Sequence, residues 1–155
     1  MRDTINRLSA HKGDEGFTLI ELLVVVVIIG VLVAIAVPVY LNYRQGAADK
    51  SAQSDVRGAI STIEQWYTDN SNTYPSTPTG AQNGSFNLGT GTGTVGKITL
   101  SDKTTMVYKS VSTSAYKVCA TNTGGSGKYY VYDSSAGGSV KADSTINSGN
   151  FATCG

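Results

Sequence analysis

The distribution of apolar and polar residues divides the chain into two unlike parts. Twenty consecutive residues, from Leu22 to Leu41, carry no charge, and Val, Ile and Leu dominate among them. As a helix they extend over roughly 30 Å, the thickness of the hydrocarbon core of a bilayer. By contrast, thirteen of the eighteen glycines lie at or after Gly80. The pattern predicts an apolar helix joined to a glycine-rich globular head.

A second helical pattern follows the apolar run without a break. Apolar residues recur at steps of three and four on one stripe, and most charged residues lie off it. The stripe consists of Ala48, Ala52, Val56, Ala59, Ile60, Ile63, Trp66 and Tyr67. We therefore expect one helix from near Phe17 to about Asn70, on the order of 80 Å long. Pro38 removes a backbone hydrogen bond within it, which predicts a kink near residues 34–38.

The remainder of the chain has the pattern of loops and short strands. Residues 71–96 are rich in Gly, Ser, Thr, Asn and Pro, which is typical of loops. Residues 134–155 have little strand or helix pattern. Between these segments, strands are expected at Lys97–Leu100, Thr105–Ser112, Ala115–Thr121 and Lys128–Asp133. The predicted fold class is α+β, with the amphipathic helix packed on a small antiparallel sheet of about four strands over residues 97–133.

The tyrosines of these strands permit two interpretations. They form either a binding surface or electron path, or a set of aromatic cross-strand pairs in a small core. The second interpretation requires no further assumption, and we favour it. The tyrosines are Tyr108, Tyr116, Tyr129, Tyr130 and Tyr132.

Composition and charge exclude several classes of function. The formal net charge of +1 provides no basic field for nucleic acid. The one histidine, His11, precedes the apolar run, and the cysteines lie far apart at Cys119 and Cys154, so no cluster has the spacing of a metal site. We therefore expect no enzyme activity, no metal and no cofactor.

A glycine-rich segment imitates a nucleotide-binding motif. Gly91 to Gly96 satisfies G-x-G-x-x-G, and Lys97 completes most of a phosphate-binding loop. Such a loop needs a helix after it, whose N-terminus faces the phosphate. Here a strand is expected at Lys97–Leu100, and Ile98 stands where a magnesium-binding Ser or Thr is needed. The segment is therefore interpreted as a low-complexity loop.

Hydropathy alone leaves two interpretations of the apolar run, a membrane anchor and a secretory signal peptide. Ala34-Ile35-Ala36 has the A-x-A form of a signal-peptidase site, after which Val37 would be the first residue. Two features agree poorly with both interpretations. Glu21 places a carboxylate at the edge of the run, and the run continues into a patterned amphipathic helix.

The stretch Gly16-Phe17-Thr18-Leu19-Ile20-Glu21, which opens the uncharged run, resembles the N-terminal signature of type IV pilins and of the related pseudopilins of type II secretion. The resemblance covers Gly16 to about Tyr43 closely and extends loosely to Pro75. It implies that residues 1–16 are a leader, that a prepilin peptidase cuts between Gly16 and Phe17, and that the Phe17 amine is then N-methylated. Asp14-Glu15 departs from the basic leaders of many relatives.

The resemblance also implies roles for three residues of the helix. Glu21 would pair with the new N-terminal amine, that of Phe17, on an adjacent subunit during assembly, because opposite charges attract strongly in a low dielectric. The alternative is a glutamate at the membrane interface that is hydrogen-bonded to water. Gly30 and Pro38 match the positions between which the helix melts in assembled pili.

The expected organisation of the chain follows. Residues 17–43 would form the membrane and filament-core half of the helix, residues 44–70 its amphipathic half, and residues 71–155 the head, in which 71–96 match the αβ-loop of pilins. Residues 119–154 match their disulfide-bounded region. A Cys119–Cys154 bridge would stabilise the head by roughly 3–4 kcal/mol in the chain-entropy model; free thiols are the alternative.

These expectations together describe a type IV pilin, a structural subunit that forms a homo-oligomeric helical filament. The implied partners are the prepilin peptidase and methyltransferase and the pilus assembly platform and motor. The subunit would stay in the cytoplasmic membrane as a single-pass protein with its head outside, and later in an extracellular filament. A type II secretion pseudopilin or a minor pilin is one alternative. A membrane-anchored enzyme or binding domain with an uncut leader is another.

Overall fold

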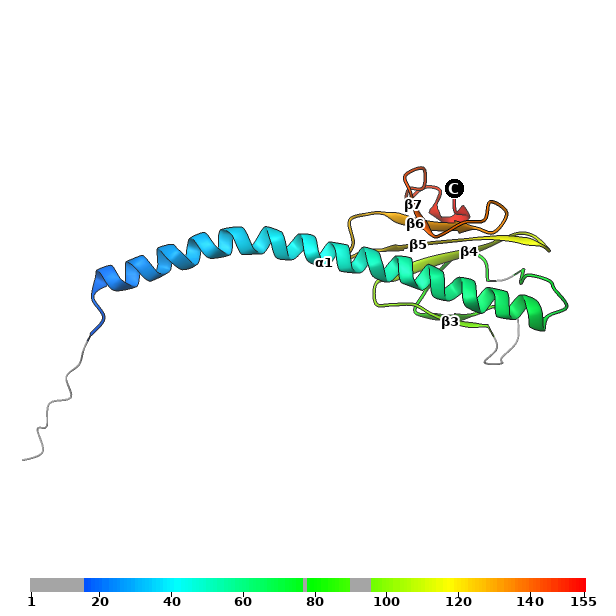
Figure 1. Cartoon of the computed structure of the whole chain (residues 1–155), viewed down its shortest axis with the longest axis horizontal. Coiled ribbons are helices and arrows are strands. Elements are labelled where there is room, and N and C mark those ends of the chain that lie inside the picture. The colour runs from blue at the N-terminus through cyan, green and yellow to red at the C-terminus, as the bar shows by residue number, and fades with distance from the viewer. Residues whose placement is uncertain (1–15, 77, 90–95) are drawn as a thin grey trace, which may run out of the picture. The chain divides into compact units, whose positions relative to one another are not determined.

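The computed structural model divides the chain into two compact units, Met1–Val39 and Tyr40–Gly155, and each unit is described separately. The structure describes residues 16–76, 78–89 and 96–155. These residues form one long helix, seven strands and a short 3-10 helix, in that order (Figure 1). The predicted α+β class is confirmed.

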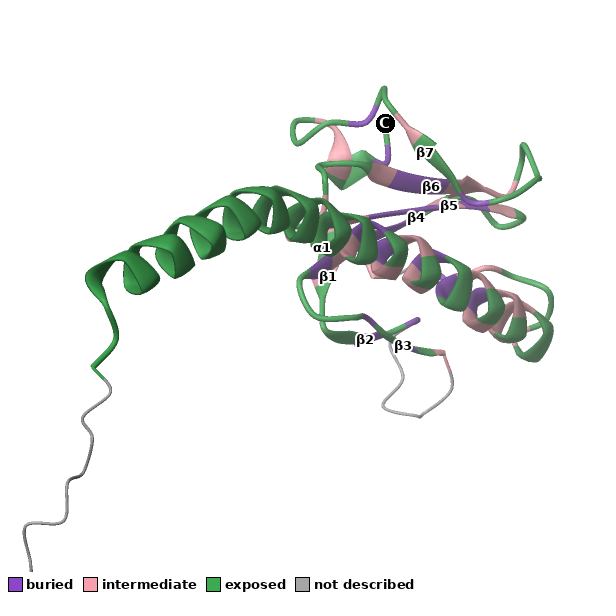
Figure 2. Cartoon of the chain, turned by 60° about the vertical axis from the view of Figure 1, so that its left-hand side comes forward, coloured by how far each residue is buried: buried purple, intermediate pink, exposed green. Residues whose placement is uncertain are grey.

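The helix α1 spans Leu19–Asp69 and is helical without interruption through Gly30 and Pro38. The sequence placed its ends within two residues of these bounds. Within the first unit its large apolar side chains are 48–82% exposed, and Figure 2 shows this part of the helix as exposed throughout. By length and composition α1 can cross a membrane. A continuous apolar surface of this size requires either lipid or other protein chains around it.

The main sheet of the head is antiparallel and has five strands in the order β1-β4-β5-β6-β7. Its centre is the hairpin of β4 (Thr104–Ser112) and β5 (Ala115–Asn122), next to which lies β6 (Tyr129–Asp133). The edges are β1 (Ala81–Asn83) and β7 (Lys141–Asp143). The sheet therefore has one strand more than the predicted number of about four. The two edge strands have three residues each, and pairing with their neighbours determines them, because so short a segment has no hydrophobic pattern of its own.

A second, two-stranded sheet joins the segment that was predicted to be a loop to the strand that was predicted after it. In this sheet β2 (Ser85–Asn87) pairs with β3 (Lys97–Thr99), and Phe86 lies opposite Ile98. The strand predicted at residues 97–100 therefore exists, but it does not belong to the main sheet. Trp66 of α1 packs under this pair. A Cβ atom on Gly89 or Gly96 would lie 2.5 or 2.6 Å from its ring, so both positions require glycine.

The core of the head lies between α1 and the main sheet. The predicted stripe of the helix is buried at Ala52, Val56, Ala59 and Ile63, which are at most 1% exposed. It packs against alternate residues of the strands, namely Met106, Tyr108, Tyr116, Val118, Ala120 and Tyr130. Figure 2 shows the buried side of α1 facing the sheet. The packing follows the two periods of the sequence, 3.6 residues for the helix and 2 for the strands.

Three carboxylates of α1 add polar links to this interface. Asp49 accepts hydrogen bonds from the backbone N–H and the hydroxyl of Ser126, at 3.0 and 2.5 Å. Asp55 accepts both from the N–H and from the hydroxyl of Ser101, each at 2.9 Å. Glu64 accepts from the hydroxyls of two tyrosines that are described below. The helix is therefore joined to the head at three levels along its length.

The opposite face of the sheet is covered by the C-terminal segment. Val107, Cys119 and Val131 of this face form a second apolar cluster with Ile146 and Cys154. The 3-10 helix η1 (Phe151–Thr153) completes the cover, and the Tyr129 ring packs 5.2 Å from that of Phe151. The segment predicted to have little structure thus forms part of the core.

Candidate functional site

The N-terminus of α1 carries a capping box. The N–H of Glu21 donates to the hydroxyl oxygen of Thr18 at 3.3 Å, and Oε2 of Glu21 accepts from the N–H and the hydroxyl of Thr18 at 2.8 and 2.7 Å. The carbonyl of Thr18 accepts the hydrogen bond of Leu22 N–H at 3.2 Å, which opens the helix. These bonds satisfy N–H groups that the first turn of a helix leaves without partners. The Glu21 carboxylate therefore has a partner within its own chain.

Thr18, the partner of Glu21 in this capping box, was not among the residues predicted from the sequence. Thr18-Leu19-Ile20-Glu21 has the S/T-x-x-E form of a capping box before an apolar run. The sequence therefore contains the signal for a capping box. The same four residues belong to the pilin-like motif, in which Glu21 was given a role in assembly.

Gly16 and Phe17 precede the helix in a non-helical conformation. Phe17 is 88% exposed, and a Cβ atom on Gly16 would meet no other atom within 4 Å. Packing within the described residues therefore does not require glycine at position 16. Residues 1–15, which hold the rest of the predicted leader, lie outside the described part of the chain. The predicted cleavage at this bond stays a prediction.

Gly30 and Pro38 both lie within the exposed apolar part of α1. A Cβ atom on Gly30 would also meet no other atom within 4 Å. Both residues are helical in this structure. The kink at Pro38 and the melting of this segment in a filament remain predictions.

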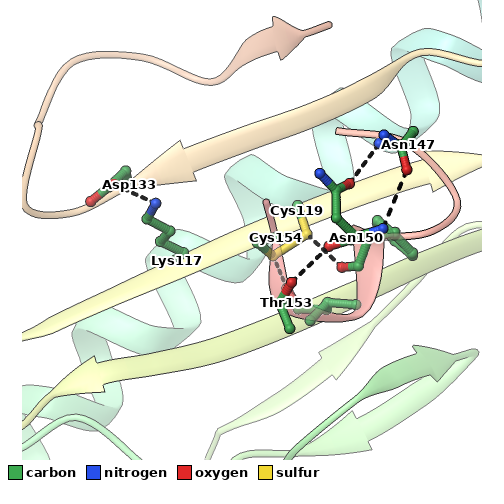
Figure 3. The surroundings of a disulfide bond; sticks show 9 residues. Lys117, Cys119, Asp133, Asn147, Asn150, Thr153 and Cys154 are labelled. Atoms are coloured by element: carbon green, nitrogen blue, oxygen red, sulfur yellow. Dashed lines mark hydrogen bonds and ion pairs between the residues drawn. A yellow bond between two sulfur atoms is a disulfide. The ribbon is translucent and has the colours of Figure 1, made fainter. Parts of the chain in front are cut away.

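Cys119 and Cys154 form the predicted disulfide (Figure 3). Both are buried, at 0 and 3% exposure. The bridge joins the central strand β5 to the end of the chain and so holds the C-terminal segment on the sheet. Asn147 and Asn150 close this segment locally, since Oδ1 of Asn150 accepts from the N–H of Asn147 at 2.7 Å.

An ion pair lies on the same face of the sheet. The Lys117 ammonium and the Asp133 carboxylate are 3.2 Å apart, and the two residues are direct cross-strand partners. The hydroxyl of Ser135 also donates to Asp133 at 2.5 Å. The Ser135 hydrogen bond, followed by Lys117, lowers the pKa of the Asp133 carboxyl below its usual value.

Most of the tyrosines of the head pack together in the core. Ring centroids lie 5.9 Å apart for Tyr108 and Tyr116, 5.8 Å for Tyr116 and Tyr132, and 4.7 Å for Tyr116 and Tyr74. The two pairs within the sheet, Tyr108–Tyr116 and Tyr116–Tyr132, are diagonal rather than directly opposite, because Ser110 faces Tyr116 and Val118 faces both Tyr108 and Tyr132. The core interpretation is therefore confirmed, although the pairs are diagonal.

A carboxylate holds two of these hydroxyls. Tyr116 and Tyr74 donate to Glu64 of α1, at 2.8 and 3.1 Å, and the hydroxyl of Tyr108 donates to the carbonyl of Pro75 at 2.6 Å. Burial, followed by the hydrogen bond to Glu64, raises the pKa of Tyr74 to about 12. The same causes raise the pKa of Tyr116 further, and burial raises that of Tyr108. These bonds fix the start of the predicted αβ-loop against the helix.

The glycine-rich segment after β2 shows no feature of a nucleotide site in its described portion. Residues 90–95 lie outside the description, but Lys97–Thr99 is a strand where a phosphate-binding loop requires a helix. Among the described residues no group of three or more His, Cys, Asp or Glu side chains is arranged to hold a metal ion.

Comparison with known proteins places this geometry in context. Residues 11–37 match the family described as prokaryotic N-terminal methylation motif. That range contains Gly16, Phe17, Glu21 and Gly30 and ends one residue before Pro38. The chain carries a prepilin-type methylation motif. The resemblance stated from the sequence is thereby confirmed, since the motif begins before the capping box and continues through the apolar run of α1.

The relatives of this protein include type II secretion proteins and a fimbrial protein. The chain is 42% identical over 67 residues to the type II secretion system core protein G of Pectobacterium carotovorum, and the match covers 43% of this chain and 42% of the relative. It is 39% identical over 72 residues to core protein G of Pseudomonas aeruginosa, a match that covers 46% of this chain and 50% of the relative. It is 46% identical over 52 residues to a fimbrial protein of Pseudomonas aeruginosa, a match that covers 34% of this chain and 29% of the relative. The chain therefore spans at most half the length of these relatives, and it is pilin-like over that part.

Proposed function

We propose that this chain is the structural subunit of a type IV pilus. A prepilin peptidase cuts it after Gly16 and the Phe17 amine is N-methylated. The cytoplasmic membrane holds the subunit through the apolar part of α1, with the head outside. An assembly platform and motor then polymerise copies of the chain into an extracellular filament. The subunit needs no cofactor and performs no catalysis.

The observation that carries this proposal is the start of α1. An uncharged helix surface is exposed on all sides, and it begins with a single carboxylate, four residues after the proposed first residue, Phe17. A simple anchor has no need of a carboxylate at that position, where a charge is costly. In a helix that moves from lipid into a bundle of protein helices, the carboxylate can form an ion pair, because a group of opposite charge is present only in the bundle.

The proposed partner of Glu21 is the Phe17 amine of a neighbouring subunit. Cleavage creates this amine next to the capping box, where the carboxylate already accepts bonds from Thr18. An ammonium group is a stronger partner than a hydroxyl for a carboxylate. Pairing would therefore set the axial register between subunits without an additional charged site.

The disulfide of the head agrees with a subunit whose head lies outside the cytoplasmic membrane. The Cys119–Cys154 bridge encloses the C-terminal part of the head, as the sequence resemblance to the disulfide-bounded region of pilins implies. A disulfide there suits a subunit that works outside the cell, because it persists in oxidising surroundings and supports a small core.

Mass spectrometry of sheared surface filaments tests the proposal. We expect the chain in abundance, beginning at N-methylated Phe17 and with its two cysteines bridged. A chain that begins at Val37, or one that is absent from the filaments while present in the membrane with an intact leader, would contradict the proposal.

A second candidate is the major pseudopilin of a type II secretion system, which the identity to two core G proteins favours. Deletion of the gene separates the two functions. A pilin deletion removes surface filaments and leaves the secreted proteins in the medium. A pseudopilin deletion retains those secreted proteins in the periplasm and leaves surface filaments intact. Complementation with the wild-type chain is the control in both cases.

A further inference from the structure

We propose that Asn83 is a site of spontaneous deamidation, at which the backbone nitrogen of Gly84 attacks the side-chain amide and converts asparagine to aspartate or isoaspartate. The reaction needs no enzyme, and its only other reactant is water. All the residues that take part belong to the unit Tyr40–Gly155. The site therefore adds one negative charge to the head as the protein ages.

Asn83 and Gly84 form the connection between two strands. Asn83 is the last residue of β1 and Ser85 is the first residue of β2, so Gly84 alone separates the strands (Figure 2). All three residues are exposed. Asn83 is also the one asparagine of the chain that glycine follows. Water therefore reaches both the side-chain amide and the peptide bond beside it.

Glycine at position 84 removes the steric barrier to the attack. In other residues the Cβ atom crowds the backbone nitrogen as it approaches the side chain before it. Gly84 has no Cβ atom, and the place of that atom is open, with no other atom within 4 Å. Its φ of +72° favours glycine, so the turn itself requires this residue. The fold thus supplies the glycine that the reaction needs.

The attacking nitrogen has no competing partner among the described residues. The carbonyl of Gly84 accepts a hydrogen bond from the N–H of Leu100 at 2.8 Å, but no described residue accepts from the N–H of Gly84. The N–H of Leu88, by contrast, donates to the carbonyl of Gly96 at 2.9 Å. An unbonded N–H loses its proton to hydroxide more readily, because no hydrogen bond must break first.

A hydroxyl group polarises the carbon that is attacked. The Thr105 hydroxyl donates to Oδ1 of Asn83 at 2.6 Å, and the two residues are direct cross-strand partners in β4 and β1. The bond withdraws electron density from Cγ and stabilises the negative charge that develops on Oδ1 during the attack. No described residue holds the other amide atom, Nδ2, which is the leaving group.

The reaction is an intramolecular acyl transfer. The Gly84 nitrogen, after losing its proton, forms a bond to Cγ of Asn83, and the bond from Cγ to Nδ2 breaks. Nδ2 leaves as ammonia with a proton returned from water. The product is a five-membered succinimide, and its closure is favoured because the two groups belong to adjacent residues. Water then opens the ring at one of its two carbonyls, which gives aspartate or isoaspartate.

Other asparagines of the head lack these features and provide internal controls. Asn87 is exposed, but Leu88 follows it, and the N–H of Leu88 is hydrogen-bonded. Asn122 is 5% exposed, and its Nδ2 atom donates to the carbonyl of Asp102 at 2.9 Å. Asn83 should therefore convert well before either of them.

The two products would affect the head differently. Aspartate keeps an acceptor for the Thr105 hydroxyl and adds a negative charge to the end of β1. Isoaspartate also adds one carbon atom to the backbone between β1 and β2. Because β2 holds the buried Phe86 opposite Ile98 of β3, we expect the added length to loosen the two-stranded sheet.

Incubation of the full wild-type chain in detergent tests the proposal. The chain is kept in heavy-oxygen water, and peptide mass spectrometry follows the incorporation of heavy oxygen at each asparagine. We expect Asn83 to convert about tenfold faster than Asn87, which corresponds to a barrier lower by about 1.4 kcal/mol. The rate should rise with pH, because the nitrogen attacks only after it has lost its proton. Equal rates at Asn83 and Asn87, or an unconverted Asn83, overturn the proposal.

Variants of the reacting groups provide the second measurement. Thr105→Val removes the hydroxyl and should slow the conversion severalfold, whereas Thr105→Ser keeps the hydroxyl and should retain the wild-type rate. Circular dichroism shows whether each variant is folded. Asn83→Gln, which would have to close a larger ring, should stay unconverted, and Ser85→Ala, which leaves the reacting groups in place, should convert normally. An unchanged rate in a folded Thr105→Val chain would refute the part assigned to Thr105.

Discussion

The hydroxyl of Thr18 and the Oε2 atom of Glu21 lie 2.7 Å apart at the first turn of α1. Through this bond the one charged residue between Phe17 and Leu41 is held by its own chain before any neighbour is present. Both bonds from Thr18 go to Oε2 of Glu21, so in the proposed assembly an amine on another subunit can pair with the Oε1 atom while Thr18 keeps its bonds. The bond also marks the helix start immediately after the proposed cleavage site.

Replacing Glu21 by alanine should leave cleavage after Gly16 largely intact and should abolish efficient incorporation into filaments. In the proposed function, cleavage would depend on the residues before the helix, whereas incorporation would depend on the carboxylate. Immunoblots of membrane and sheared fractions measure both steps. Thr18→Ser, which keeps the hydroxyl, is the matched control and should assemble normally. Normal piliation of Glu21→Ala would refute the assigned role.

Removal of the disulfide should destabilise the head strongly. Cys154→Ser opens a loop whose ends are 35 residues apart, for which the chain-entropy model gives about 4 kcal/mol. The expected result is a lower denaturation midpoint of the full chain in detergent, with the wild-type chain under reductant shifting by a similar amount. Thr153→Ser changes the neighbouring residue and keeps the bridge, so it should retain the wild-type midpoint.

Two glycines with similar backbones should respond differently to alanine. Gly96 has a φ of +75° and its missing Cβ would lie 2.6 Å from the Trp66 ring, whereas Gly127 has a φ of +79° and open space around it. Gly127→Ala should cost about 1 kcal/mol for the backbone alone. Gly96→Ala should cost about 1–3 kcal/mol more, because the ring must move. Denaturant unfolding of both variants measures the difference, and equal losses would refute the packing of Trp66 on this loop.

The head should lose stability in alkali as its tyrosines ionise. Folding raises the pKa of Tyr74 from the usual value of 10.0 to about 12. A raised pKa contributes stability that is complete below pH 10 and is lost as the pH rises toward 12, since the unfolded chain gives up the proton first. Unfolding followed by circular dichroism across this range should show the loss.

A tyrosine outside the head is the control for that experiment. Tyr43→Phe removes an exposed hydroxyl on α1 and should leave the alkaline transition unchanged. Tyr74→Phe should weaken its pH dependence, because the phenol that gives up the proton on unfolding is gone. A transition that is identical in both variants would show that the contact between Glu64 and Tyr74 does not govern it.

The strong periodic patterns of the chain were sufficient to predict most of the fold. The helix and the strands β4, β5 and β6 were placed within one or two residues, because a buried stripe or face imposes its own period on the sequence. The short strands β1, β2 and β7 were not predicted. They have three residues each, so a partner strand determines them and no local pattern does.

The charged residues of the helix also separate what the sequence predicts from what only the folded structure shows. The sequence placed Asp49, Asp55 and Glu64 off the apolar stripe, which is typical of a solvated face. In the structure all three accept hydrogen bonds from the head, which come from Ser126, Ser101, Tyr74 and Tyr116. Their donors lie 10 to 77 residues away along the chain. No local pattern indicates such pairs, because they depend on how distant segments meet.

By itself, the sequence determined the apolar run, the motif from Gly16 to Glu21 and the amphipathic stripe, since each is a property of neighbouring residues. Only the tertiary structure decided which carboxylates hold the head and where the fifth strand of the sheet lies. Those features depend on contacts between residues that are distant in sequence, and such contacts exist only after the chain has folded.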